Sequence, residues 1–128
     1  MHAFSPPNHL EGQRWQGLRI GLLGGSFHPP HEGHIRLSHT AIKFLGLDCV
    51  WWLVTPKNPI KDSVSAASYE ERLKAAQYIT SQHPVIFVSN LEQVLESAFT
   101  YQTLQAMHRY FPATSFIWLG GFDLAMTF

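Results

Sequence analysis

Residues 21–34 read GLLGGSFHPPHEGH, and the rest of the chain can be interpreted outward from this segment. Its apolar start, within the run Leu18–Leu23, is typical of a strand that is buried on both faces, and Gly24–Gly25 end that strand. Proline is tolerated in the first turn of a helix but not in its interior, so we expect a helix to begin near Pro30–Glu32. The segment therefore predicts a strand, a tight glycine turn and a helix N-terminus.

Three more apolar runs alternate with helical patterns along the chain. The expected strands after the first are Cys49–Val54, Val85–Val88 and Ser115–Leu119. This alternation is typical of an α/β fold, in which a parallel sheet is built with right-handed crossovers and helices cover its faces. In such sheets ligands bind outside the carboxyl ends of the strands, and the polar segments of this chain follow those ends.

Each expected helix has a recognisable start or stop. The first should end at Gly46 and place Ile35, Ser38, Ile42 and Leu45 on its core face. Ser68 and Glu71 have the spacing of a capping box, which predicts a second helix through Arg72, Leu73, Ala76 and Ile79. Thr100 is the expected cap of a third helix, with Tyr101, Leu104, Met107 or His108, and Phe111 on one side.

The bulk composition limits the class of protein. A chain of 128 residues that is 45% hydrophobic can form one domain, expected over residues 18–128 after a flexible lead-in over residues 1–17. Nine basic and nine acidic side chains give no net charge, so neither nucleic acid nor a membrane surface is an expected partner. No apolar run approaches the roughly 18 to 20 residues that span a bilayer, and no secretion signal is recognised. A cytoplasmic protein is expected, with its single cysteine, Cys49, buried.

The glycine turn before a helix is a candidate phosphate site. The N-terminus of a helix presents unpaired backbone N–H groups and a partial positive charge. His31 and His34 would project from the first turn as hydrogen-bond donors, and Gly33 leaves room for a ligand to approach. Zinc binding by His28, His31 and His34 is disfavoured, because two prolines prevent one helix from carrying all three. No Gly-Lys-Ser/Thr follows, so this is no Walker A loop.

Residues 24–34 resemble the signature G-G-[ST]-F-[DN]-P-x-H-x-G-H of the nucleotidyltransferase superfamily with the H-x-G-H motif. More narrowly, they are similar to bacterial nicotinate-nucleotide adenylyltransferases. The resemblance continues over residues 18–128 in Trp51–Pro56, Asn58–Asp62, Glu71–Arg72, Thr100–Leu104, Phe116–Leu119 and Gly121-x-Asp123. It implies a Rossmann-like nucleotidyltransferase fold. It also implies transfer of adenylate from ATP, with Mg²⁺, to nicotinate mononucleotide, giving deamido-NAD and pyrophosphate in NAD biosynthesis without a covalent enzyme intermediate.

The resemblance also implies roles for individual residues. His31 and His34 would be catalytic and would bind the ATP phosphates. The other residues expected at the ATP phosphates are Gly24, Gly25, Ser26, Phe27, Gly33 and Lys61. Those expected at the acceptor nucleotide are Asn58, Thr100 and Asp123, and no residue is expected to bind a metal directly. Arg72 is expected on a solvated helix face, with a substrate role as the less favoured alternative, and Trp51 and Trp52 are expected in the core.

Three features depart from the family pattern. His28 stands where the family has Asp or Asn, and Gly120–Leu124 differs from the usual Met-Gly-Ala-Asp-Asn. The family's later strands and a late Arg-bearing motif have no counterpart, so the fold is expected to be incomplete at the C-terminus. The alternatives are a sibling adenylyl- or cytidylyltransferase with another acceptor, or an inactive nucleotide-binding fragment; a zinc module is the weakest. The oligomeric state cannot be read from the sequence.

Overall fold

A four-stranded parallel sheet with the strand order β3-β2-β1-β4 forms the centre of the molecule. A computed structural model of the chain describes residues 7–56, 68–91 and 100–121. The strands are β1 (Arg19–Gly25), β2 (Cys49–Val54), β3 (Ile86–Ser89) and β4 (Ser115–Gly121). The helices are η1 (Gly12–Trp15, a 3-10 turn), α1 (Glu32–Leu45), α2 (Tyr69–Ile79) and α4 (Thr100–Tyr110). The α/β architecture with a parallel sheet that the sequence predicts is confirmed.

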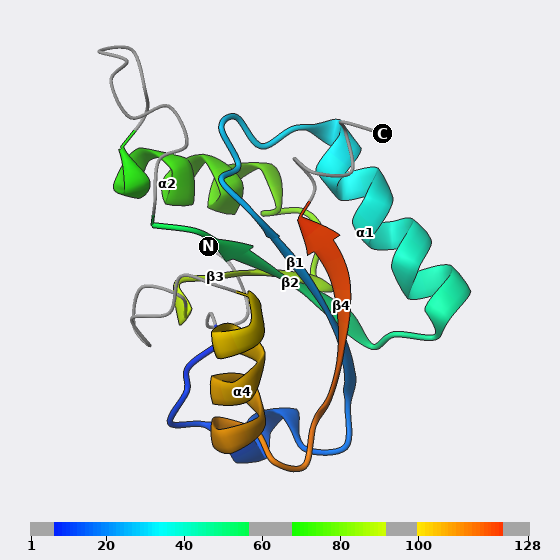
Figure 1. The fold of residues 1–128 in the computed structure, drawn as a ribbon. Coiled ribbons are helices and arrows are strands. Elements are labelled where there is room, and N and C mark those ends of the chain that lie inside the picture. The colour runs from blue at the N-terminus through cyan, green and yellow to red at the C-terminus, as the bar shows by residue number, and fades with distance from the viewer. Residues whose placement is uncertain (1–6, 57–67, 92–99, 122–128) are drawn as a thin grey trace.

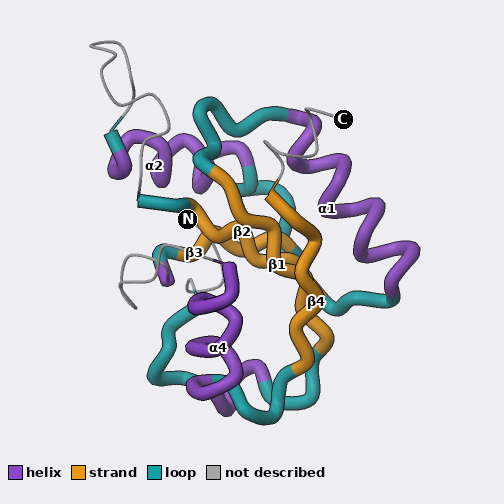
Figure 2. The backbone as a smooth tube through the Cα atoms, in the orientation of Figure 1, coloured by secondary structure: helices purple, strands orange, loops and turns teal. Residues whose placement is uncertain are grey.

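The order of the strands creates a reversal next to β1. The chain adds β2 and β3 on one side of β1 and then returns to place β4 on the other side. Figure 1 shows the consequence: α1 and α2 lie on one side of the sheet, and α4 lies on the other. Ligands of open α/β sheets bind at the carboxyl ends of the strands where such a reversal occurs. The turn that follows β1 is at that position, and Figure 2 shows it arching toward the start of α1.

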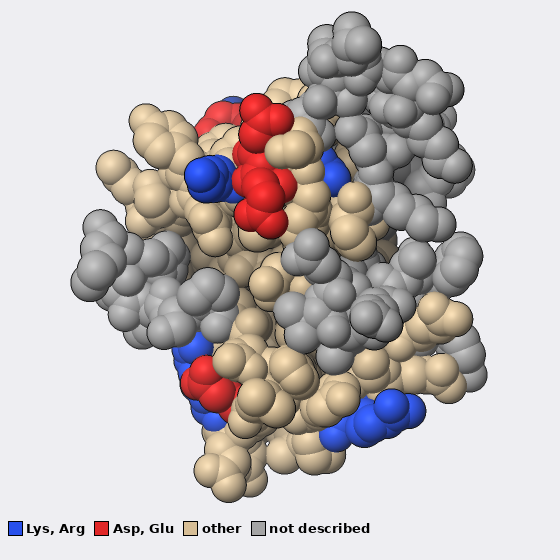
Figure 3. Space-filling model, turned by 90° about the vertical axis from the view of Figure 1, so that its left-hand side faces the viewer, with Lys and Arg blue, Asp and Glu red and all other residues tan. Residues whose placement is uncertain are grey.

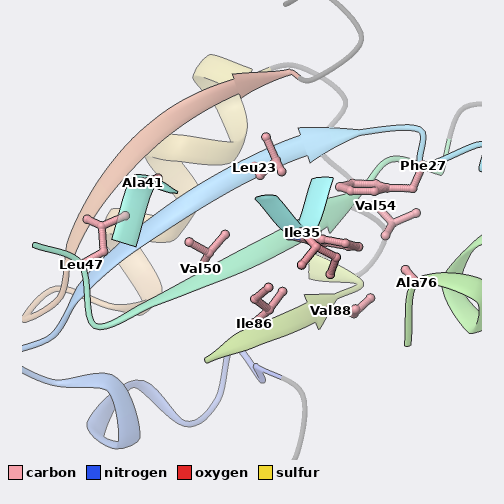
Figure 4. Close-up of a cluster of buried hydrophobic side chains, with 11 residues drawn as sticks. Leu23, Phe27, Ile35, Ala41, Leu47, Val50, Val54, Ala76, Ile86 and Val88 are labelled. Atoms are coloured by element: carbon pink, nitrogen blue, oxygen red, sulfur yellow. The ribbon is translucent and has the colours of Figure 1, made fainter. Parts of the chain in front are cut away.

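Side chains of β2 alternate between two cores, which explains why its whole sequence is apolar. Val50, Trp52 and Val54 pack beneath α1 and α2, whereas Trp51 and Leu53 pack beneath α4 and η1. Both tryptophans are fully buried, as the sequence predicts. Figure 4 shows the first cluster, in which Ile35 of α1 and Ala76 of α2 meet side chains of the strands. The two cores fix the sheet between its helices.

Two sequence-based expectations differ from the structure at the edges of these cores. Leu45, expected on the core face of α1, is 45% exposed. The chain turns at Gly46, which has φ of 64° and caps the helix, and the next residue, Leu47, fills the core position instead. Residues 7–17 also differ from the expected flexible lead-in, because Trp15 of η1 is only 3% exposed and its carbonyl accepts a hydrogen bond from the Thr114 hydroxyl.

Charged side chains and helix lengths can be described for the same residues. On the face shown in Figure 3, the charged side chains of the described residues lie in small groups of both signs. None of the described helices is long and apolar enough to cross a membrane.

Candidate active site

The turn after β1 is shaped by close packing of its backbone. A Cβ atom at Gly24 would lie 2.7 Å from the ring of Trp118 in β4, so a larger residue there would displace that tryptophan. Phe27 has φ of 52°, which few residues other than glycine adopt, and its fully buried ring is stacked 4.9 Å from that of Trp52. Burial of the aromatic ring holds this strained turn in place. Gly24, Gly25, Ser26 and Phe27 thus lie together, where the sequence places the phosphate site.

His31 and His34 form a reciprocal cap at the start of α1. The backbone N–H of Gly33 donates to Nδ1 of His31, and the backbone N–H of His31 donates to Nδ1 of His34, each over 3.0 Å. This is a capping box in which two imidazoles replace the usual hydroxyl and carboxylate. The N–H of Gly33 is therefore engaged within the protein, although the sequence suggested that a ligand could approach there.

The cap determines which nitrogen of each imidazole carries the proton. A ring nitrogen that accepts a hydrogen bond is not protonated, so the proton of each neutral ring is on Nε2. Both rings therefore carry their proton on Nε2, and their centroids are 4.2 Å apart. His31 is exposed, whereas His34 is only 2% exposed. A ligand arriving from solvent meets His31 first.

Buried polar and aromatic contacts hold the deeper histidine. The His34 ring lies 4.7 Å from that of Phe27 and 5.6 Å from that of Trp52. The indole N–H of Trp52 donates to the hydroxyl of Ser38 over 2.8 Å, and that hydroxyl donates to the carbonyl of His34 over 2.8 Å. A continuous set of contacts thus runs from the central strand β2 to the first turn of α1.

The burial of Arg72 differs from the sequence-based prediction. It is only 1% exposed, so the expected solvated helix face is wrong. Its Nη1 donates to the carbonyls of Ser26 and Thr55, both at 2.8 Å, and its Nη2 donates to the carbonyl of Pro56 at 3.3 Å. Burial lowers the pKa of the Arg72 guanidinium from its usual value. The sequence signal that could have revealed this burial is the helical spacing between Arg72 and Ala76, which places both residues on the buried face of α2.

Several predicted site residues lie outside what the structure describes. Asn58, Lys61 and Asp123 belong to undescribed segments, and the same holds for the side chain of Thr100. Thr100 is the first residue of α4, which confirms a helix there and leaves its capping role a prediction.

Neither a metal-ligand cluster nor an ionised thiol is found among the described residues. Within residues 7–56, 68–91 and 100–121, no three His, Cys, Asp or Glu side chains are close enough to hold a metal ion. Cys49 is a buried free thiol, as predicted, at the amino end of β2 and therefore at the opposite end of the strand from the turn. Burial, reinforced by the neighbouring Asp48, raises the pKa of this thiol to about 12, so it stays protonated. Among the described residues, His31 and His34 at the start of α1, together with the turn after β1, form the group best suited to bind an anion.

Comparison of the sequence with known protein families identifies the family of this chain. The sequence profile of the family described as cytidylyltransferase-like matches residues 22–128, from within β1 to the last residue. The chain belongs to that family. The cytidylyltransferase-like match includes the turn, both histidines and Arg72. The superfamily expected from the H-x-G-H motif is therefore confirmed.

Similar sequences carry a more specific name. The chain is 46% identical over 107 residues to a "probable nicotinate-nucleotide adenylyltransferase" of Parvibaculum lavamentivorans, covering 84% of this chain and 53% of that protein. It is 45% identical over 111 residues to a protein of the same name from Methylorubrum extorquens, covering 87% of this chain and 60% of that protein. The chain thus spans only a little over half the length of these curated relatives.

A solved structure supports the fold. The nicotinic acid mononucleotide adenylyltransferase of Plasmodium falciparum, complexed with APC, superimposes with a TM-score of 0.64. The two sequences are 20% identical, and the match covers 79% of this chain and 49% of that one. At this identity the comparison shows a shared fold alone, which is the nucleotidyltransferase type of Rossmann-like sheet that the sequence predicts.

Proposed function

We propose that the protein contributes the nucleotide site of an enzyme that transfers adenylate from ATP to nicotinate mononucleotide. The observation that carries this proposal is the imidazole capping box, which orients the Nε2–H donors of His31 and His34 at a helix N-terminus. Triphosphate oxygens accept such hydrogen bonds, and the partial positive charge of the helix end favours the same anion. The names of the relatives with about 45% identity support nicotinate mononucleotide as the acceptor.

The proposed reaction requires no nucleophile from the protein. A phosphate oxygen of nicotinate mononucleotide attacks the α-phosphorus of ATP and forms a new P–O bond. The bond from that phosphorus to the bridging oxygen breaks, and pyrophosphate leaves with the electron pair, which gives deamido-NAD. Catalysis then consists of positioning and charge stabilisation, which the imidazole donors can supply. A cysteine that stays protonated at the far end of β2 is compatible with this scheme.

The remaining predicted contacts are part of the same proposal. Gly24–Phe27 and Gly33 would line the phosphates with Lys61, whereas Asn58, Thr100 and Asp123 would contact the acceptor. Mg²⁺ fits as a companion of ATP, since it is usually bound through substrate phosphates and water. When bound it would neutralise phosphate charge. A cytoplasmic location is proposed because ATP is the substrate and the only cysteine is a free thiol.

Asparagine substitution separates the capping role of His31 from its proposed phosphate role. Asparagine is a good N-cap, so His31→Asn should keep the free energy of unfolding, whereas His31→Ala should lower it by about 0.5–2 kcal/mol. Both variants lack the Nε2 donor and should bind Mg²⁺–ATP roughly 10- to 100-fold more weakly, as expected for loss of a hydrogen bond to a charged group. Isothermal titration calorimetry measures the affinity. Wild-type affinity in His31→Asn would show that this imidazole does not contact the nucleotide.

Turnover assays distinguish the acceptor and the nucleotide. Pyrophosphate release should be faster with nicotinate mononucleotide than with nicotinamide mononucleotide or phosphopantetheine, and faster with ATP than with CTP. The family description favours keeping a cytidylyltransferase as the second candidate, which CTP-dependent turnover would support. ATP binding without turnover would indicate a nucleotide-binding fragment.

A further inference from the structure

The guanidinium of Arg72 connects two segments that are far apart in the sequence. One is the turn after β1, through the carbonyl of Ser26, and the other is the segment after β2, through the carbonyls of Thr55 and Pro56. These segments lead to the predicted phosphate turn on one side and toward the predicted Asn58–Lys61 contacts on the other. One further backbone bond, from the N–H of Thr55 to the carbonyl of Gly25, joins the same two segments.

Arg72 is held without a carboxylate partner within the described residues. Its Nε has no hydrogen-bond partner there, and the aromatic ring of Tyr69 lies 5.5 Å from its Cζ. A buried cation is expensive unless its donors are used, and here three carbonyl oxygens accept from them. Nη1 alone donates to both segments, and Nη2 adds the carbonyl of Pro56. A lysine ammonium would end one bond short of the position of Nη1 and would lack the second nitrogen of the guanidinium fork. The use of arginine at this position therefore points to bridging.

We propose that Arg72 is a positioning residue that fixes the turn after β1 relative to the segment after β2, so that nucleotide affinity depends on it without contact with the nucleotide. Its consequence for affinity rests on the proposed function. A phosphate site made of backbone groups and capped histidines is sensitive to displacement of about 1 Å. The carbonyl of Ser26, one residue before Phe27, is the point at which Arg72 holds that site.

Local hydrogen exchange tests the bridge without any ligand. In Arg72→Met, amide exchange should accelerate at least tenfold in peptides covering residues 24–33 and 53–56, with little change in α4. Arg72→Lys should accelerate the same peptides, less strongly. Arg36→Met is the matched control, because Arg36 is an exposed arginine of α1, and it should exchange like the wild type. Unchanged exchange in both segments, or acceleration spread evenly over the chain, would overturn the proposal.

Calorimetry with Mg²⁺–ATP tests the consequence. Arg72→Met should bind roughly 10- to 100-fold more weakly and Arg72→Lys about tenfold more weakly, with Arg36→Met unchanged. Free guanidinium at millimolar concentration should restore affinity to Arg72→Ala. If Arg72→Met does not fold, Arg72→Lys decides, and wild-type affinity in that variant would refute the bridging role. Failure of the wild type itself to bind ATP would count against the proposed function, while the exchange experiment would still decide the bridge.

Discussion

The two faces of the sheet are held together by different kinds of contact. Beneath α4 and η1 the core is dominated by aromatic rings: Trp51 lies 4.9 Å from Trp15 and 5.3 Å from Phe111, both edge to face. Beneath α1 and α2 the apolar cluster is crossed by buried polar contacts, which link Trp52 to Ser38 and Arg72 to the two loop segments. The candidate site is on the side covered by α1 and α2, where these buried hydrogen bonds lie. Hydrogen bonds with defined geometry fix the relative positions of the groups that they join.

This difference suggests that the two faces of the sheet have different roles. Substitutions beneath α4 should change the stability of the domain and leave the nucleotide affinity of the folded molecule unaltered. Substitutions of the polar contacts beneath α1 and α2 should change the site as well. Four predictions follow in order of decreasing effect; the first tests this distinction, and the others test the contacts that stabilise each face and the start of α2.

The largest effect is expected at Phe111, which directly follows α4 and is fully buried. Phe111→Ala should lower the free energy of unfolding by about 3–5 kcal/mol, because it removes a large ring and leaves a cavity next to Trp51. Urea denaturation at 25 °C measures this loss, and the exposed neighbour Arg109→Ala is the control. Mg²⁺–ATP affinity per folded molecule should not change. A weaker affinity would remove the distinction between the faces.

A smaller effect is expected at Ser38. Ser38→Ala leaves the buried indole N–H of Trp52 without its acceptor, and this should cost about 1–3 kcal/mol of unfolding free energy. Thr40→Ala, at an exposed position of the same helix, is the matched control for helix propensity. Equal urea midpoints for the two variants would mean that the Trp52–Ser38 contact does not stabilise this face.

Cys49 provides a pH test of the α4 side. Its folded pKa of about 12 lies above the ordinary value of 9.0, so its contribution is present below pH 9 and is lost as the pH rises toward 12. At pH 10, one unit above the pKa of the unfolded thiol, ionisation of the unfolded state should lower the free energy of unfolding by about 1.4 kcal/mol. Comparison with Cys49→Ala at pH 8 and pH 10 isolates this term. A difference between the variants that is independent of pH would argue against a protected thiol.

The smallest effect is expected at Glu71, which is on the surface of α2. Hydrogen bonds from the backbone N–H and the hydroxyl of Ser68 lower the pKa of the Glu71 carboxyl. Its stabilising effect is therefore present at neutral pH and is lost as the pH falls through the lowered folded pKa. Glu71→Ala should be slightly less stable than the wild type at pH 7 and equally stable in strong acid, by urea midpoint. Glu70→Ala, outside the capping box, should behave like the wild type at both pH values.

Much of the local structure could be predicted from short-range patterns. The capping box of Ser68 and Glu71 and the stop at Gly46 depend on residues within one helical turn, and both are present. The continuous apolar run Cys49–Val54 predicted a strand, and β2 has these bounds. At the candidate site, the motif placed His31 and His34 at the start of a helix, and the structure agrees.

The sequence-based predictions of burial that were wrong have a common physical cause. Leu45 follows the helical period of α1, but the chain turns away at Gly46 before that side chain can reach the sheet. An arginine on a helix is usually solvated, yet Arg72 is buried because carbonyls from two distant loops surround it. Trp15 is buried because η1 packs against Trp51 and Phe87. Each outcome depends on a partner that the local sequence does not contain.

The sequence by itself determined the class of fold, the positions of the strands and helices, and the pair of histidines at the glycine turn, because these follow from spacing, propensity and motif within a few residues. The tertiary structure decided the strand order β3-β2-β1-β4, the burial of His34, and the bridge made by Arg72. The Trp52–Ser38 and Arg72–Thr55 hydrogen bonds, for example, join residues 14 and 17 positions apart. Such contacts form only when the chain is folded.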